Sequence, residues 1–202
     1  MKIMQTLWVA VFALVLCALP AKADVEVNQP APDFTLTDSK GQEHALSDYK
    51  GKFVVLEWVN YECPFVIKHY GSGNMQKLQK DLTSQDVVWL SINSSAEGKQ
   101  GYFSADEINQ MMTQKNVSSS AYLLDTDGAV GKMYGAKTTP HMYIINPEGV
   151  LVYQGAIDDK SGFDPQEIPT SHNYVMAAFD EAKAGNPVSV PVTKSYGCSV
   201  KY

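Results

Sequence analysis

Two cysteines are the side chains of this sequence best suited to covalent chemistry. Cys63 follows an apolar run at 53–59 and directly precedes Pro64, and Cys198 lies near the C-terminus. Proline suits the first position of a helix, and a helix N-terminus lowers the pKa of a nearby thiol, which favours the reactive thiolate. We therefore interpret Cys63 as a redox-active residue, with a buried structural cysteine as the alternative.

Ionisable residues flank Cys63 on both sides. Glu57 lies within the apolar run, where a carboxyl group would have a raised pKa and could exchange protons with a thiol. The alternative is that Glu57 faces solvent or a lysine. Glu62 directly precedes the cysteine and would oppose thiolate formation, whereas Lys68 and His69, about one helical turn further on, could offset that charge.

Strands and helices alternate around these residues. We expect strands at 53–59, 87–92 and 122–124, and a hairpin of 142–145 with 150–153. We expect helices from 64 to 82 with a break at 71–73, from 104 to 115, from 128 to 134 and from 172 to 184. Ser104 and Glu107 have the spacing of a capping box. This order predicts an α/β fold with a central mixed sheet flanked by helices, an N-terminal extension and a C-terminal tail.

The first 23 residues have the pattern of a secretory signal peptide. Lys2 precedes an apolar run, and Ala21-Lys22-Ala23 is a small-residue cleavage site. We expect an exported, periplasmic protein with a domain at 24–185 and a tail at 186–202, without stable membrane insertion after cleavage. Cys17 would be removed with the signal; its lipidation is the less favoured alternative because a large leucine precedes it.

Export has a consequence for the two remaining cysteines. An oxidising compartment lets disulfides persist, and two cysteines allow one intramolecular pairing. A structural Cys63–Cys198 bond would stabilise the fold by about 4–5 kcal/mol in the chain-entropy description.

The net charge of the chain limits the classes of partner that it can bind. The chain has 22 acidic residues, and all 16 of its strongly basic residues are lysines. An acidic protein with scattered lysines is a poor nucleic-acid binder, so we expect no nucleic-acid partner.

Three motifs in order carry a family resemblance that spans about residues 28–184. They are Ala31-Pro32-Asp33-Phe34, Cys63-Pro64 at the end of the apolar run, and Thr138-Thr139-Pro140 before the hairpin. With these motifs the sequence resembles the thioredoxin-like superfamily. Within it, the chain is similar to redoxins related to alkyl hydroperoxide reductases and thiol-specific antioxidants, and to exported thiol-disulfide oxidoreductases.

The resemblance implies a thioredoxin-like fold in which the Cys63 thiolate attacks a disulfide and forms a mixed disulfide. It implies that Pro140 is a cis-proline beside the cysteine, and that Thr139, Pro140 and Pro64 form the substrate-binding edge. The partners would be protein or small-molecule thiols and disulfides, with no cofactor and no metal. Val66 stands where the family usually has a second cysteine, so Cys198 or an external thiol would have to resolve the mixed disulfide.

Two further functions stay open at this point. A peroxiredoxin-like peroxidase is the first, with peroxide as substrate, but Asn60 and Leu56 stand at its threonine and proline positions, and the chain has no arginine to stabilise the thiolate. A non-catalytic binding module with a structural Cys63–Cys198 disulfide is the second. A metal site of Cys63 with His69, His141 or His172 is less favoured, because related copper carriers have two cysteines close together.

Overall fold

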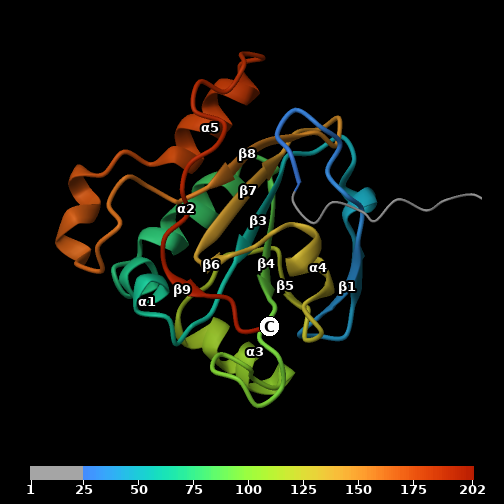
Figure 1. Cartoon of the computed structure of the whole chain (residues 1–202), viewed down its shortest axis with the longest axis vertical. Coiled ribbons are helices and arrows are strands. Elements are labelled where there is room, and N and C mark those ends of the chain that lie inside the picture. The colour runs from blue at the N-terminus through green and yellow to red at the C-terminus, as the bar shows by residue number, and fades with distance from the viewer. Residues whose placement is uncertain (1–24) are drawn as a thin grey trace, which may run out of the picture.

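The structure, a computed structural model, describes residues 25–202, so the expected signal peptide and Cys17 lie outside the described residues. Seven strands form a mixed sheet in the order β2-β1-β5-β4-β3-β7-β8 (Figure 1). The strands are β1 (Thr35–Asp38), β2 (Glu43–Ala45), β3 (Val54–Trp58), β4 (Val88–Asn93), β5 (Ala121–Leu124), β7 (His141–Ile145) and β8 (Leu151–Gly155). The expected thioredoxin-like α/β architecture with a central mixed sheet is confirmed.

Helices cover both faces of this sheet. They are α1 (Pro64–Gly71), α2 (Asn74–Thr83), α3 (Ala105–Gln114), α4 (Ala129–Met133) and α5 (Tyr174–Lys183), with 3₁₀ turns at Leu46–Tyr49 and Pro165–Thr170. The break between α1 and α2 falls at Gly73, which has a φ of 77°. The capping box at the start of α3 is present, since the Ser104 side chain accepts from the Glu107 N–H.

Strand β3 lies at the centre of the sheet and is buried along its whole length. It runs parallel to β4 and antiparallel to β7. Val55 packs in one apolar cluster with residues of α2 and α5, whereas Leu56 and Trp58 pack in a second cluster with residues of α4. The continuous apolar run therefore forms a strand that is covered on both faces, as predicted.

The C-terminal segment after α5 returns across the domain. Figure 1 shows it passing from α5 to β9 (Cys198–Ser199), which pairs with β6 (Thr138–Thr139) beside the start of α1. Backbone hydrogen bonds hold it before β9, from Gln154 to Pro191, and after β9, from Val200 to Lys137. This path brings the end of the chain to the N-terminal end of α1.

Across residues 25–202, every helix is too short or too polar to cross a lipid bilayer.

Candidate active site

The N-terminus of α1 positions Cys63. The cysteine is the N-cap of the helix, and Pro64 occupies the first turn. The side chain is fully buried, and its Sγ lies 3.0 Å from the Thr139 carbonyl oxygen, to which the thiol donates. The turn between a buried strand and a proline-started helix therefore places the sulfur against β6.

The short β6–β9 ladder brings Cys198 to the same place. Thr139 pairs with Cys198 in antiparallel register, and the Cys198 N–H donates to the Cys63 Sγ at 3.4 Å. Both cysteines are free thiols, and Cys198 is partly exposed. The bond between Thr139 and Pro140 is cis, as the resemblance implied. Cys63, Cys198, Thr139 and Pro140 thus lie together, although Cys63 and Cys198 are far apart in the sequence.

Gly197 permits this close approach. Its φ is +136°, and a Cβ added there would lie 2.1 Å from the Thr139 carbonyl oxygen. Real Cβ atoms do not come so close to a backbone oxygen, so a side chain at 197 would push β9 away from β6. The glycine before Cys198 is therefore a requirement of the ladder.

The two thiols have opposite pKa shifts. Burial raises the pKa of Cys63, but hydrogen bonds from the Cys198 thiol and from the Val66 and Cys198 N–H groups outweigh it and leave the pKa lowered. Burial and the neighbouring Cys63 raise the pKa of Cys198 to about 11. Cys63 therefore loses its proton more readily than Cys198, as expected for the attacking sulfur of such a pair.

Glu57 is fully buried in β3, so the solvent-facing alternative is wrong. Its carboxyl group accepts from Trp89 Nε1 at 2.8 Å, from the Tyr70 hydroxyl at 2.9 Å and from Ser91 and Gln79, both at 3.1 Å. Burial raises the pKa of Glu57, and these hydrogen bonds offset part of the rise. Cys63 is not among its hydrogen-bond partners in the described chain, so proton exchange between them stays a prediction.

Lys68 and His69 do not have the neighbours expected from the sequence. The Lys68 Nζ is buried and donates to the carbonyl oxygens of Lys160 and Gly162 at 2.7 and 3.0 Å. Burial lowers the pKa of His69 to about 4, so its ring is neutral at neutral pH. Glu62 accepts instead from the Gly101 N–H at 2.7 Å. Neither Lys68 nor His69 is hydrogen-bonded to Glu62. A neutral His69 cannot offset its charge, and for Lys68 the offset stays a prediction.

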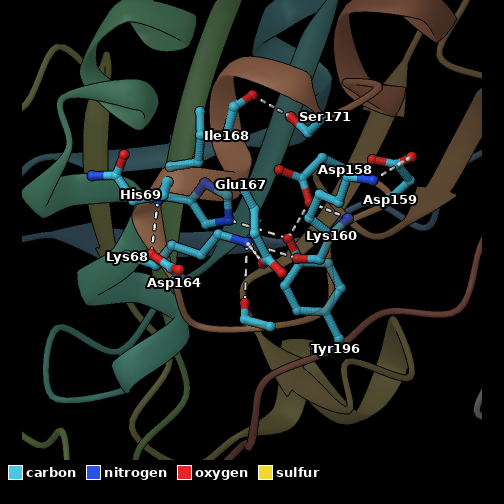
Figure 2. Close-up of polar contacts among 12 residues, drawn as sticks. Lys68, His69, Asp158, Asp159, Lys160, Asp164, Glu167, Ile168, Ser171 and Tyr196 are labelled. Carbon is cyan, nitrogen blue, oxygen red and sulfur yellow. Dashed lines mark hydrogen bonds and ion pairs between the residues drawn. The ribbon is translucent and has the colours of Figure 1, made fainter.

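Sequence reasoning missed a polar cluster next to this site. Figure 2 shows three side chains that converge, with Lys68 beside them. They are His69 of α1, Asp158 of the loop after β8, and Tyr196 of the C-terminal segment. The Tyr196 hydroxyl lies 3.1 Å from His69 Nε2 and 2.5 Å from Asp158 Oδ1. No local pattern in the sequence joined Tyr196 to Asp158 or to His69, because these contacts link residues 38 and 127 positions apart.

The histidines do not assemble a metal site in the described part of the chain. No group of three His, Cys, Asp or Glu side chains within residues 25–202 could hold a metal ion. His141 lies against the Lys137 N–H and the Tyr143 hydroxyl, and His69 against Tyr196.

Comparison with known proteins gives a consistent family. The model of the AhpC/TSA family matches residues 27–154 of the chain. The chain is 32% identical over 142 residues to the thiol-disulfide oxidoreductase ResA of Geobacillus kaustophilus, covering 62% of this chain and 82% of that protein. It is 30% identical over 147 residues to the ResA of Bacillus subtilis, covering 73% of each. It is also 26% identical over 144 residues to the peroxiredoxin TSA1-B of Candida albicans, covering 62% of this chain and 67% of that protein.

Solved structures agree with the fold. An uncharacterized conserved protein of Geobacillus kaustophilus superposes with a TM-score of 0.74 and 27% identity, over 88% of this chain and 92% of that one. A hypothetical protein of Sinorhizobium meliloti superposes with a TM-score of 0.75 and 23% identity, over 89% and 96% of the two chains.

Proposed function

The chain belongs to the AhpC/TSA family, and we propose that it is a thiol-disulfide oxidoreductase that attacks with Cys63 and resolves with Cys198. The observation that carries this proposal is the 3.4 Å contact between the Cys198 N–H and the Cys63 Sγ, made by the β6–β9 ladder. Similarity to two thiol-disulfide oxidoreductases supports the same chemistry.

The proposed reaction has two exchange steps. The Cys63 thiolate attacks one sulfur of a substrate disulfide, forms a Cys63–substrate mixed disulfide and releases the first substrate thiolate. Cys198 then loses its proton and attacks the Cys63 sulfur, forming a Cys63–Cys198 disulfide and releasing the second substrate thiolate. The substrate disulfide gains two electrons, and the two protein thiols lose them.

The surroundings of Cys63 suit this reaction in the reduced protein. In the thiol form, Cys63 donates to the Thr139 carbonyl; in the thiolate form, its sulfur accepts from Cys198. Thr139, Pro140 and Pro64 are the proposed substrate-binding edge, and Glu57 is the proposed buried proton carrier. Because β9 pairs with Thr139 and Cys63 is buried, β9 has to move aside before a substrate disulfide can reach the sulfur. We propose protein or small-molecule disulfides as substrates and an exported, periplasmic location for the mature chain.

Two substitutions test the function. Wild-type protein should reduce a protein disulfide such as that of insulin with dithiothreitol as electron donor, and Cys63→Ser should abolish this activity. In a reaction without dithiothreitol, pre-reduced Cys198→Ser should accumulate a stable mixed disulfide on Cys63, visible by intact mass, because the resolving thiol is missing. Full activity in Cys63→Ser would overturn the proposal.

The alternatives give different results in the same preparation. A Cys63–Cys198 reduction potential well below about −300 mV would indicate a structural disulfide in a binding module. Rapid reaction with hydrogen peroxide that is lost in Cys63→Ser would favour peroxidase chemistry, which the similarity to a peroxiredoxin keeps as the second candidate.

A further inference from the structure

The C-terminal segment is fixed on both sides of Cys198. Before it, the Thr193 Oγ1 hydrogen-bonds the Tyr153 hydroxyl at 2.7 Å and accepts from the Ala156 N–H at 2.8 Å. After it, the Val200 N–H donates to the Lys137 carbonyl at 3.2 Å. Between these anchors, β9 makes a ladder of only two residues. The position of Cys198 therefore depends strongly on any side chain that fixes 194–197.

Tyr196 is that side chain. Its ring lies 6.0 Å from the Phe65 ring, centroid to centroid, and the Lys68 Nζ lies 5.8 Å from its centroid. Its hydroxyl lies between His69 and Asp158, as Figure 2 shows. Only Gly197 separates Tyr196 from Cys198 along the chain, so a displacement of this ring moves the resolving sulfur.

The hydrogen bonds around Tyr196 have a defined direction. Asn74 Nδ2 donates to His69 Nδ1 at 2.9 Å, so the neutral ring carries its proton on Nε2 and donates to the Tyr196 hydroxyl. The Tyr196 hydroxyl in turn donates to Asp158 Oδ1 at 2.5 Å. Burial lowers the pKa of His69 to about 4, with the charge of Lys68 acting in the same direction and that of Asp158 opposing it. The chain of donors therefore persists throughout the neutral range.

The partners of Tyr196 are themselves fixed to the element that carries Cys63. His69 belongs to α1, whose N-cap is Cys63. The Asp158 carboxylate is 2% exposed, and its Oδ1 also accepts from the Lys160 N–H at 3.0 Å. Lys68, also on α1, holds the Lys160 carbonyl at 2.7 Å. One helix thus positions both the attacking sulfur and the contact that holds the segment bearing the resolving sulfur.

We propose that Tyr196 is a positioning residue for the resolving step, and that its hydrogen bonds to His69 and Asp158 hold Cys198 in reach of the Cys63 mixed disulfide. This inference rests on the proposed function. Asp158, Tyr196 and Cys198 all lie beyond residue 154, where the family match ends. We call His69, Tyr196 and Asp158 the latch. It holds the segment that carries Cys198, the proposed substitute for a second cysteine next to Cys63.

The test separates the two exchange steps with one reagent. The aromatic disulfide dithionitrobenzoate, supplied below one equivalent, reacts with Cys63 and releases one coloured thionitrobenzoate. The Cys198 thiolate then attacks the Cys63 sulfur, forms the Cys63–Cys198 bond and releases the second thionitrobenzoate. Stopped-flow absorbance gives both rates, and Cys198→Ser gives the first step alone.

Tyr196→Phe removes the hydroxyl and keeps the ring. We expect its second step to be at least about tenfold slower than wild type, because a hydrogen bond to a charged group is among the stronger ones in a protein. The first step should slow far less than the second, because Cys63 makes no contact with the hydroxyl and a displaced β9 uncovers its sulfur while removing hydrogen bonds that lower its pKa. Tyr102→Phe is the matched control, because it makes the same chemical change on an exposed tyrosine, and both of its steps should match wild type.

Asp158→Asn and Asp158→Ala provide a second pair. The asparagine keeps a carbonyl oxygen that can accept from Tyr196, so its second step should lie between wild type and Asp158→Ala. An unchanged second step in both Tyr196→Phe and Asp158→Ala would overturn the latch, as would equal slowing of both steps. A wild-type protein that releases only the first thionitrobenzoate would overturn the resolving role of Cys198, and the latch with it. That result is recognisable because it appears without any substitution.

Discussion

Replacing Gly197 with alanine should release β9 from the active site. The residue has a φ of +136°, and the new Cβ would lie 2.1 Å from the Thr139 carbonyl oxygen and 2.7 Å from the Thr139 carbonyl carbon. These neighbours are backbone atoms of β6, next to Pro140, and cannot rotate away as a side chain could. The conflict is relieved only if residues 197–199 move outward.

The size of the effect follows from two contributions. An unfavourable φ for a residue with a Cβ costs about 1–3 kcal/mol, and the contact of the Cβ with the Thr139 carbonyl adds to this cost in the docked state alone. The φ cost by itself reduces the docked fraction of β9 relative to the undocked one by about 5- to 150-fold. Because undocking is local, the thermal stability of the domain should fall by less than this cost.

Two measurements check the prediction. The rate at which a maleimide alkylates Cys198, followed by mass spectrometry, should rise in Gly197→Ala. The equilibrium constant for closing the Cys63–Cys198 bond against glutathione should fall. Gly185→Ala is the control, because Gly185 also has a positive φ, +77°, but nothing lies within 4 Å of the added Cβ. Wild-type values for both quantities in Gly197→Ala would refute the assignment of β9 as the element that holds Cys198.

Three further predictions concern the buried ionisable groups. Alkylation of Cys63 as a function of pH should give a pKa below the usual thiol value, and Cys198→Ala should raise it because the hydrogen bond from the Cys198 thiol is lost; a fall would contradict this. Burial raises the pKa of Glu57 in the folded state, so stability should decrease as pH rises from the unfolded to the folded pKa, by at most about 1.4 kcal/mol per pH unit. Glu57→Gln should remove this slope in urea unfolding, and an unchanged slope would count against a titrating Glu57. Lys68→Met should lower stability by about 1–3 kcal/mol, because it leaves the partly buried carbonyl oxygens of Lys160 and Gly162 without their donor. It should also make 158–170 more sensitive to protease, and unchanged digestion would contradict the contact.

Local sequence patterns determined the framework of the site. The apolar run before Cys63 predicted a strand covered on both faces, and Pro64 predicted the helix start that makes Cys63 an N-cap. The same run placed Glu57 in a buried strand, where its side chain lies. These features depend on residues close in sequence, since hydrophobic periodicity and the conformational limits of proline act over a few positions.

Neighbours far apart in the sequence were decided by tertiary structure alone. The sequence allowed Lys68 to lie near Glu62, but packing turns it toward the carbonyl groups of Lys160 and Gly162. No local sequence pattern indicated a role for Tyr196, because its partners His69 and Asp158 come from a helix and a loop outside its own segment.

By itself, the sequence determined that Cys63 ends a buried strand, starts a helix and lacks a second cysteine at Val66. That Cys198 lies beside Cys63 was decided only by the folded chain, where Gly197 lets β9 lie against β6. The physical reason is that a contact across 135 residues depends on the path and anchoring of the whole C-terminal segment. Periodicity and turn preferences report on the next few residues, and they do not determine where a distant end of the chain will pack.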